Sequence, residues 1–283
     1  MSKKNEAAII TLVAQTHIHS GVGSSTGALD LPVARERATH YPFVPGSGVK
    51  GAMRVWADER ADNLDVDSLF GKEGQAENDS GGAGAAGNLL CSDARLLLLP
   101  VRCLSDAFKW VTCPAILQRF EKDCERAGAP CSMTIIKPEK GKYFGDGKEN
   151  EWLGLEEREF EYAGTVDDSI IETLAKIVDK TDLKNRLVVL SDKDFTWFAR
   201  YALPVMARNV LSKDGKKKSE NLWYEESLAP DTIMYLLLGE RNDGAVGNVT
   251  KVIKDKARYI QIGGNETIGQ GWFEMKKYEG EQT

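Results

Sequence analysis

The sequence has few of the residues that usually build metal or cofactor sites. It contains three histidines and five cysteines among 283 residues, and no two cysteines form a C-x-x-C pair. An odd number of scattered cysteines argues against a disulfide framework and against a zinc site, so we expect reduced, mostly buried thiols. An H-x-H zinc site at His17 and His19 is also disfavoured, because no third and fourth ligand is evident.

Long apolar runs are missing as well. The clearest ones, LLLLPV at 96–101 and MYLLL at 234–238, have the length of strands and are too short to cross a membrane. The N-terminal MSKKNEAAIITLV lacks the hydrophobic core and the cleavage site of a signal peptide. With 42% hydrophobic and 28% charged residues, the composition is that of a globular protein with a sizeable core. We therefore expect a cytoplasmic protein with no membrane partner.

An overall positive charge is absent too. The net charge of −6 gives no general sign of nucleic-acid binding. The charge is unevenly distributed, however. Residues 1–55 carry six basic and three acidic side chains, residues 200–258 carry eleven and eight, and the acidic residues are concentrated between positions 58 and 182. A locally basic face is therefore compatible with this acidic chain.

Nucleotide-binding fingerprints are absent despite two glycine-rich stretches, THIHSGVGSSTGALDLP at 16–32 and GSGVKGAMR at 46–54. Neither stretch ends in the Gly-Lys-Ser/Thr of a P-loop. The glycines of the first stretch miss the G-x-G-x-x-G spacing, and Asp-Leu-Pro follows them where a helix would have to begin. A bound nucleotide cofactor is therefore disfavoured.

These glycines still allow the backbone to approach a bulky ligand closely. Ser47 is a plausible N-cap of a helix that carries Lys50 one turn further on, and a helix start of this kind favours anions. Two such places within one short segment favour a phosphate backbone over a single phosphate. The alternative is a tight turn followed by a capped helix with a solvated lysine.

Hydrophobic periodicity predicts strands with helices between them and no regular βαβα alternation, which favours an α+β fold. The segment 71–88 is rich in Gly, Ala and Asn and is expected to be a mobile loop. The expected strands lie at 7–15, 94–102, 234–238 and on both sides of a lysine-rich turn at 213–218, with a strand, a glycine loop and a strand at 259–279. The expected helices lie at 47–62, 115–127 and 169–180, with the end of a last helix at 251–258.

Taken together, these stretches resemble the RAMP superfamily. HSGVGSSTGALDLPVARERATHYPFVPGSGVKGAMR at 19–54 is similar to the N-terminal signature of the family and, more narrowly, to repeating backbone subunits of type III-B CRISPR (Cmr) complexes. LFG at 69–71, LWYEE at 222–226 and YIQIGGNETIGQGW at 259–272 agree with it in order along nearly the whole chain. The middle of the chain carries no matching motif.

The resemblance implies a single RAMP domain over 1–283. Its core would be RRM-like (ferredoxin-like) with an antiparallel sheet, large insertions at about 72–88 and 132–195, and a β-hairpin "thumb" at about 205–224. It also implies that copies of the chain line up along a guide RNA as a helical filament. The thumb of each copy would interrupt the pairing of guide and target, and each copy would cut the single-stranded target RNA there. The implied partners are both RNAs, further copies of the chain and other Cmr subunits.

The resemblance assigns the cleavage reaction to Asp30 and implies a divalent cation, Mg²⁺ or Mn²⁺. RNA supplies its own nucleophile, the 2′-hydroxyl, so the enzyme needs a splayed backbone, a base or metal at the 2′-oxygen, and charge stabilisation at the phosphate. Asp30 on a glycine-rich loop suits either proton abstraction or metal binding, because Mg²⁺ often uses one protein carboxylate together with phosphate oxygens. Taken alone, an Asp before Leu-Pro is typical of a turn or a cap.

Three other side chains are further catalytic candidates. His19 lies at a family position where histidine occurs and could transfer protons, although a histidine that follows a first strand often only packs or forms a hydrogen bond. Glu225 and Glu226 could lie near the displaced target nucleotide if the preceding hairpin is the thumb. The alternative is that they are paired surface acids.

The remaining candidates would contact RNA, chiefly through phosphates that carry no sequence information. They are Ser20, Gly21, Ser24, Arg35, Arg37, Ser47, Lys50, Arg54, Lys216, Lys217, Lys218, Gly264 and Asn265. The lysine-rich turn could instead be a solvated loop, and the loop at 263–271 an ordinary glycine hairpin.

Three other functions stay open at this point. The first is a scaffold subunit that binds guide RNA without cleaving. The second is a DNA-targeting relative that does not cleave, which the Asp of GALDLP disfavours. The third is a small-molecule enzyme, which would copurify without nucleic acid.

Overall fold

The computed structural model describes residues 6–25, 27, 29–60, 64–72, 86–211, 219–242, 244–255 and 257–281. Its strands are β1 (Ala7–Ala14), β2 (Phe43–Val44), β3 (Leu89–Cys91), β4 (Ala94–Arg102), β5 (Phe108–Thr112), β6 (Lys142–Phe144), β7 (Trp152–Leu155), β8 (Arg158–Gly164), β9 (Leu187–Leu190), β10 (Val205–Leu211), β11 (Ser219–Glu226), β12 (Ile233–Glu240), β13 (Tyr259–Gln261) and β14 (Trp272–Lys277). Its helices are α1 (Gly46–Arg60), α2 (Val66–Phe70), α3 (Pro114–Arg126), α4 (Asp168–Leu174), α5 (Lys180–Arg186), α6 (Asp192–Tyr201), α7 (Ala245–Asp255) and the 3₁₀ helix η1 (Glu266–Ile268). None of these helices is both long and apolar enough to cross a bilayer.

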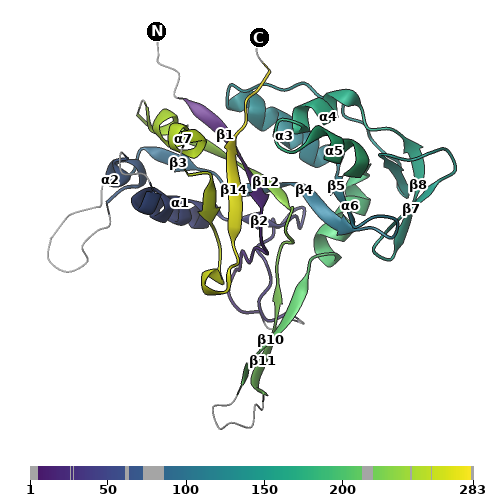
Figure 1. Ribbon diagram of the computed structural model, residues 1–283, viewed down its shortest axis with the longest axis horizontal. Helices are drawn as coiled ribbons and strands as arrows, with labels where there is room; N and C mark the ends of the chain where they lie inside the picture. The colour runs from purple at the N-terminus through teal and green to yellow at the C-terminus, as the bar shows by residue number, and fades with distance from the viewer. Residues whose placement is uncertain are drawn as a thin grey trace.

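Four strands and two helices form a ferredoxin-like core, as expected (Figure 1). The strand order at the centre of the main sheet is β14-β1-β12-β4, and all three pairings are antiparallel. Helix α1 connects β1 towards β4, and α7 connects β12 towards β14. This βαββαβ order is that of an RRM-like fold. The chain is therefore α+β with a mostly antiparallel sheet.

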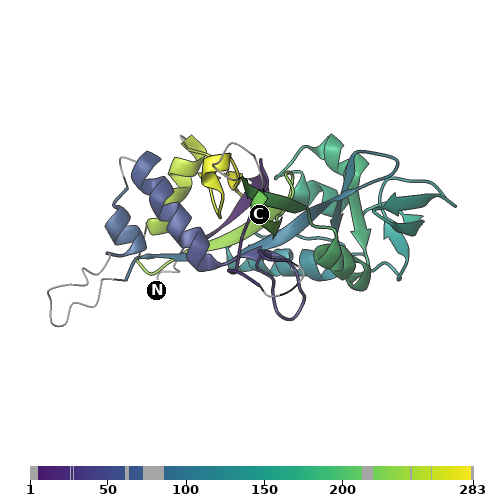
Figure 2. The same cartoon turned by 90° about the horizontal axis from the view of Figure 1, so that it is seen from below.

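Apolar side chains on both faces of the central sheet explain the layers above and below it. Strand β1 is buried along nearly its whole length. Helices α1 and α7 cover one face, and α3 packs on the other (Figure 2). Helix α1 buries Val49, Met53 and Trp56, which follow the i, i+4, i+7 spacing of one helix face, and Ala52 beside them is half-buried. On the α3 side, the ring of Phe120 packs edge-on against Tyr235 of β12, with centroids 4.9 Å apart. The functional loops are thus anchored to a rigid centre.

The first turn of α1 differs from the expectation. The helix begins at Gly46, so Ser47 lies inside the first turn and is not the N-cap. The carboxylate of Asp93, just before β4, accepts a hydrogen bond from the Gly46 N–H at 2.7 Å. A distant side chain therefore satisfies the first free amide of the helix, one residue before Ser47.

Strand β5 and then the segment 132–195 extend the main sheet beyond β4. Strand β5 pairs with β4, β9 pairs with β5 in parallel, and β6, β8 and β7 follow to the edge. The single helix expected at 169–180 is wrong, because the segment forms α4 and then α5. Asp179 accepts hydrogen bonds from the amides of Thr181 and Asp182, which starts the second helix at Lys180.

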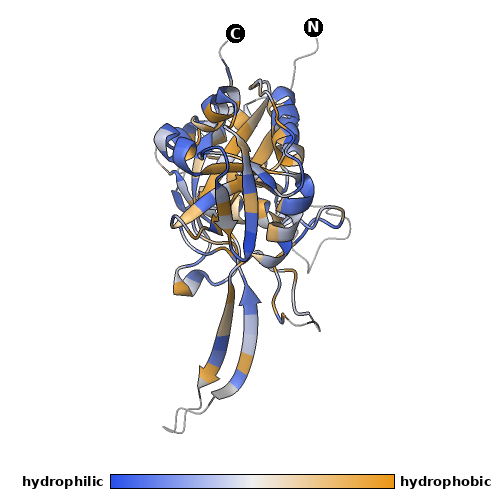
Figure 3. Cartoon of the chain, turned by 90° about the vertical axis from the view of Figure 1, so that its right-hand side faces the viewer, coloured by the Kyte–Doolittle hydropathy of each residue, from blue (hydrophilic) through white to orange (hydrophobic). Residues whose placement is uncertain are grey.

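Strands β10 and β11 form a hairpin that stands away from the body (Figures 1 and 3). They pair antiparallel from Val205 with Glu226 onwards and make a separate two-stranded sheet. Apolar side chains such as Leu222 and Tyr224 remain exposed on it. Lys216, Lys217 and Lys218 lie outside the described residues. The structure thus has a hairpin in the region where the resemblance implies one, and its role as a thumb stays a prediction.

All five cysteines are free thiols, as predicted. Cys103, Cys113, Cys124 and Cys131 are buried, and Cys91 is half-buried. Burial raises the pKa of the Cys91 and Cys113 thiols to about 12, so both stay protonated at neutral pH. The cysteines therefore serve as small core residues.

Candidate functional site

Asp30 lies against the base of the hairpin. Its Oδ2 accepts a hydrogen bond from the backbone N–H of Tyr224 at 2.8 Å. The next residue continues the contact, since the Leu31 N–H donates to the Tyr224 carbonyl at 3.1 Å and the Glu226 N–H donates to the Leu31 carbonyl at 3.0 Å. Leu31 and Glu225 form a parallel bridge. The end of the glycine-rich loop is thus attached to strand β11.

The Asp30 carboxylate keeps part of its hydrogen-bonding capacity. The side chain is half-buried, and within the described residues protein donors reach only Oδ2. The Asp30 carbonyl accepts the Ser25 N–H at 2.8 Å, which closes the loop on itself. Asp30 therefore shapes the loop, as a turn residue would, and none of the described residues donates a hydrogen bond to its Oδ1.

His19 connects the same region to a third segment. Its Nδ1 lies 2.8 Å from the carbonyl oxygen of Glu226. A carbonyl only accepts, so Nδ1 carries a proton, and Nε2 has a free lone pair in the tautomer protonated at Nδ1 alone. A Cβ built on Gly21 would lie 2.6 Å from that Nε2, so any larger residue at this position would have to displace the ring. The His19 carbonyl accepts the Gly264 N–H at 3.0 Å.

Glu225 and Glu226 are paired acids, as the alternative expected, but they are buried and do not lie on the surface. They are only 2% and 3% exposed. Glu226 accepts from Arg35 Nη2 at 2.6 Å and from the Val33 N–H at 3.0 Å. Glu225 accepts from the Asn265 amide and lies 3.2 Å from Nε of Arg208. Both carboxylates therefore hold the loops against β11, which supports a positioning role for them.

The described RNA-binding candidates divide into two groups. The first group is engaged by the fold. Ser20 is buried and donates to the Phe43 carbonyl, Arg35 is paired with Glu226, and Asn265 donates to Glu225 and Gln270. Arg54 also belongs here, because it donates to the Gly71 carbonyl and to Asp67. The second group is exposed or half-buried and comprises Gly21, Ser24, Arg37, Ser47, Lys50 and Gly264.

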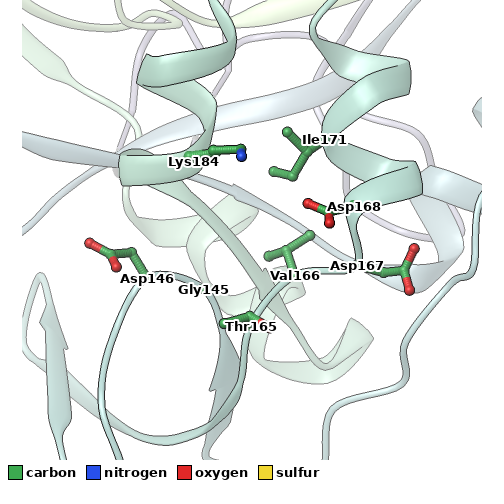
Figure 4. Close-up of a pocket in the computed structure, with 8 residues that line it drawn as sticks. All are labelled: Gly145, Asp146, Thr165, Val166, Asp167, Asp168, Ile171 and Lys184. Carbon is green, nitrogen blue, oxygen red and sulfur yellow. The ribbon is translucent and has the colours of Figure 1, made fainter.

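A hollow of about 450 Å³ lies elsewhere, between the β6–β8 edge and helices α4 and α5 (Figure 4). Asp146, Asp167, Asp168 and Lys184 line it. Asp167 already caps α4 by accepting the Ser169 N–H at 2.9 Å. The serine holds the pKa of the Asp167 carboxyl below its usual range. These contacts show that Asp167 serves as the N-cap of helix α4.

The described residues contain no group of three His, Cys, Asp or Glu side chains that could hold a metal ion. Around Asp30, the neighbouring carboxylates of Glu225 and Glu226 are already paired with Arg208 and Arg35. The donor set thus fits a divalent cation only where RNA phosphate oxygens supply the remaining ligands.

The sequence matches the RAMP superfamily over residues 10–274. It is 28% identical over 289 residues to the Cmr endoribonuclease Cmr4 of Pyrococcus furiosus, covering 95% of both chains. It is 23% identical over 294 residues to the CMR subunit Cmr4 of Saccharolobus solfataricus, covering 93% of this chain and 94% of the relative.

Two solved structures share the fold. The first is an oligomeric Cmr4 crystal structure from Pyrococcus furiosus, with TM-score 0.74, 24% identity and coverage of 99% and 100% of the two chains. The second is a cryo-EM structure of type III-B Cmr-beta bound to cognate target RNA, with TM-score 0.76, 23% identity and coverage of 96% and 97%. The family match covers most of the described core, including the hairpin and Asp30. The chain therefore belongs to the RAMP superfamily.

Proposed function

We propose that this chain is an endoribonuclease that forms the repeating backbone of a type III-B Cmr complex and cuts target RNA at regular intervals. The observation that most supports this proposal is the Asp30 carboxylate, which is attached at the base of a projecting hairpin and keeps one oxygen available. The full-length similarity to a Cmr endoribonuclease supports the same activity.

The hairpin would enter between guide and target RNA and displace a target nucleotide at its base. Displacement would turn the 2′-hydroxyl of that nucleotide in line with the next phosphorus, which is the geometry that the cleavage needs. In this proposal the backbone would pass beside Asp30. Oδ1 would then either accept the proton of the 2′-hydroxyl or bind a metal ion. His19 Nε2 would be a second proton acceptor beside the same loop, since Nδ1 is engaged by the Glu226 carbonyl.

Asp30, together with phosphate oxygens of the RNA, would hold a divalent cation, Mg²⁺ or Mn²⁺. When bound, such a cation would stabilise the negative charge that develops on the phosphate. The buried glutamates would keep Asp30 in place without contacting the RNA, because their oxygens already accept hydrogen bonds from the protein.

The proposed partners are guide RNA, single-stranded target RNA, further copies of the chain and other Cmr subunits, all in the cytoplasm. The exposed group of RNA-binding candidates would contact phosphates, together with Lys216, Lys217 and Lys218, which lie between β10 and β11 in the sequence. Contacts of this type carry no sequence information and weaken as salt rises.

The decisive experiment uses the assembled complex with an end-labelled complementary RNA, with and without EDTA. We expect cuts at a constant spacing, loss of cutting in EDTA, and recovery when Mg²⁺ or Mn²⁺ is added. An Asp30→Asn complex should bind the same RNA and leave it intact. A fully active Asn complex would overturn the assignment of Asp30.

A non-catalytic scaffold is the competing function. It predicts guide-RNA binding and no cation-dependent cutting by the wild-type complex. The same labelled-RNA experiment separates the two, since RNA that is retained but uncut by the wild-type complex favours the scaffold.

A further inference from the structure

Four basic side chains surround a hollow of about 510 Å³ between β4 and α3, which we name the basic hollow. They are Arg95, Arg119, Lys122 and Arg126. The carboxylates of Glu36 and Asp93 lie at its edge. None of the proposed catalytic or RNA-binding residues lines it.

Helix α3 presents three of these cations in a row. Arg119, Lys122 and Arg126 follow the i, i+3, i+7 spacing of one helix face, while Phe120 and Cys124 point into the core. At 1.5 Å per residue, the row is about 10 Å long. The opposite side of the helix is therefore fixed in the core, and the basic row lies at the border of α3 with the start of β4, where it lines the hollow.

A buried carboxylate fixes two of the cations. Asp123 is 1% exposed, and it accepts from Arg95 Nη1 at 2.6 Å and from Arg126 Nη1 at 2.7 Å. Each guanidinium carries five N–H donors, so most of them stay available. Arg119 forms an ion pair with Glu36. In the part of the chain that the structure describes, no carboxylate lies within 4 Å of the Lys122 ammonium.

The charge balance favours a protein partner over RNA. Asp123, Glu36 and Asp93 offset much of the positive charge of the four cations. A long polyanion prefers an uncompensated basic track. A hollow that is preorganised by a buried acid and retains a small positive charge suits a partner that brings two or three carboxylates.

The chain itself carries such carboxylates on its other face. Asp58 and Glu59 end α1, Asp65 caps α2, and all three are exposed. We name these three residues the acidic end. Among the described residues, Asp58 and Glu59 form no ion pair. Helix α1 lies on one face of the central sheet and α3 on the other (Figure 2), so one copy cannot bring the two surfaces together.

We propose that the basic hollow of one copy docks the acidic end of the next. Two complementary patches on opposite faces of one chain make a heterologous contact, which repeats from copy to copy and can build a filament. This contact rests on the proposed function, in which copies line up along an RNA. A relative with the same fold has been crystallised as an oligomer.

Charge reversal tests the contact. The full-length chain is studied by sedimentation velocity at low salt, alone and with a labelled single-stranded RNA. Lys122→Glu/Arg126→Glu should weaken association between copies at least about tenfold, because like charges would face each other. Asp58→Lys/Glu59→Lys should do the same. The chain that carries all four substitutions should associate like wild type, since its surfaces are complementary again.

Two further variants act as controls. Lys140→Glu/Lys148→Glu makes the same charge change at exposed positions near the β6–β8 edge, and it should leave association unchanged. Lys122→Glu alone breaks no ion pair of the described residues, so it should weaken association without lowering the unfolding temperature.

The proposal is overturned if wild type does not associate in either condition, if the basic-hollow variant associates like wild type, or if the four-fold variant fails to recover. It is also overturned if the basic-hollow variant lowers the affinity of a single copy for RNA and its salt dependence, since the hollow would then be an RNA contact. Cleavage that persists in the assembled variants would leave the proposed ribonuclease function intact.

Discussion

The base of the β10–β11 hairpin and the glycine-rich loop beside it differ in how far the fold satisfies their polar groups. At the hairpin base, Glu225 and Glu226 are buried, and arginines and backbone amides bind their oxygens. In the loop, Asp30 Oδ2 accepts a hydrogen bond from the Tyr224 amide, and none of the described residues donates to Oδ1. The difference suggests that fully paired acids position the site, whereas a half-satisfied acid is available for chemistry.

The strongest test of this difference is Asp30→Asn. The asparagine oxygen can still accept the Tyr224 N–H, so the free energy of unfolding should change by less than about 0.5 kcal/mol. Cleavage should fall by at least about a hundredfold, because the amide neither takes up a proton nor holds a cation well. Cleavage assays and urea titrations on one preparation measure both. A large loss of stability would mean that Asp30 is mainly structural.

Glu226→Ala should have the opposite profile. It leaves Arg35 with no carboxylate partner at a mostly buried position and removes the acceptor of the Val33 N–H. Breaking a pair of this kind costs about 3 kcal/mol or more. Urea unfolding should show this loss, while the exposed Glu157→Ala control changes stability by less than about 0.5 kcal/mol. An Ala variant that is stable but inactive would restore Glu226 as a catalytic candidate.

His19→Asn examines the intermediate case. The amide nitrogen of asparagine can replace Nδ1–H as donor to the Glu226 carbonyl, but nothing replaces Nε2. If Nε2 assists proton transfer, the cleavage rate should fall on the order of ten- to a hundredfold with little change in stability. His40→Asn is a suitable control, because His40 has φ of 61°, which asparagine tolerates. Equal rates for both variants would limit His19 to packing.

Helix α1 offers the same contrast between a side chain that the fold engages and one that it does not, with smaller expected effects. Lys50 is half-buried without a described carboxylate partner, whereas Arg54 already binds the Gly71 carbonyl and Asp67. Lys50→Ala should lower the slope of log affinity for single-stranded RNA against log salt by about 0.7. Arg54→Ala should leave that slope unchanged and destabilise the chain by about 1 kcal/mol. A reversed result would exchange their roles.

The sequence predicts local elements well where periodicity is clear. The stripe of α1, the long apolar strand β4 and the alternating strands around the hairpin follow directly from residue spacing. It fails where a distant side chain sets a boundary. Asp93 caps α1 from 47 residues away, and Asp179 starts a second helix inside a segment that reads as one. Periodicity contains neither contact.

The candidate site shows the same limit. The resemblance alone was enough to single out Asp30, and its hydrogen bond to Tyr224 joins residues 194 positions apart. Glu225 and Glu226 follow a lysine-rich turn and two aromatic residues, a context that suggests solvent exposure. Their burial depends on Arg35 and Asn265, which come from opposite ends of the chain. Only the folded arrangement distinguishes a positioning acid from a reactive one.

The hydrogen bonds between Asp30, Leu31 and β11 also have an evolutionary consequence. They lie at the root of the hairpin, so insertions or deletions towards its tip leave the register of Asp30 against Tyr224 unchanged. A change in the length of the hairpin therefore does not require realigning the carboxylate. A one-residue shift between Asp30 and Leu31 has no such freedom, because it would turn the acid away from the strand.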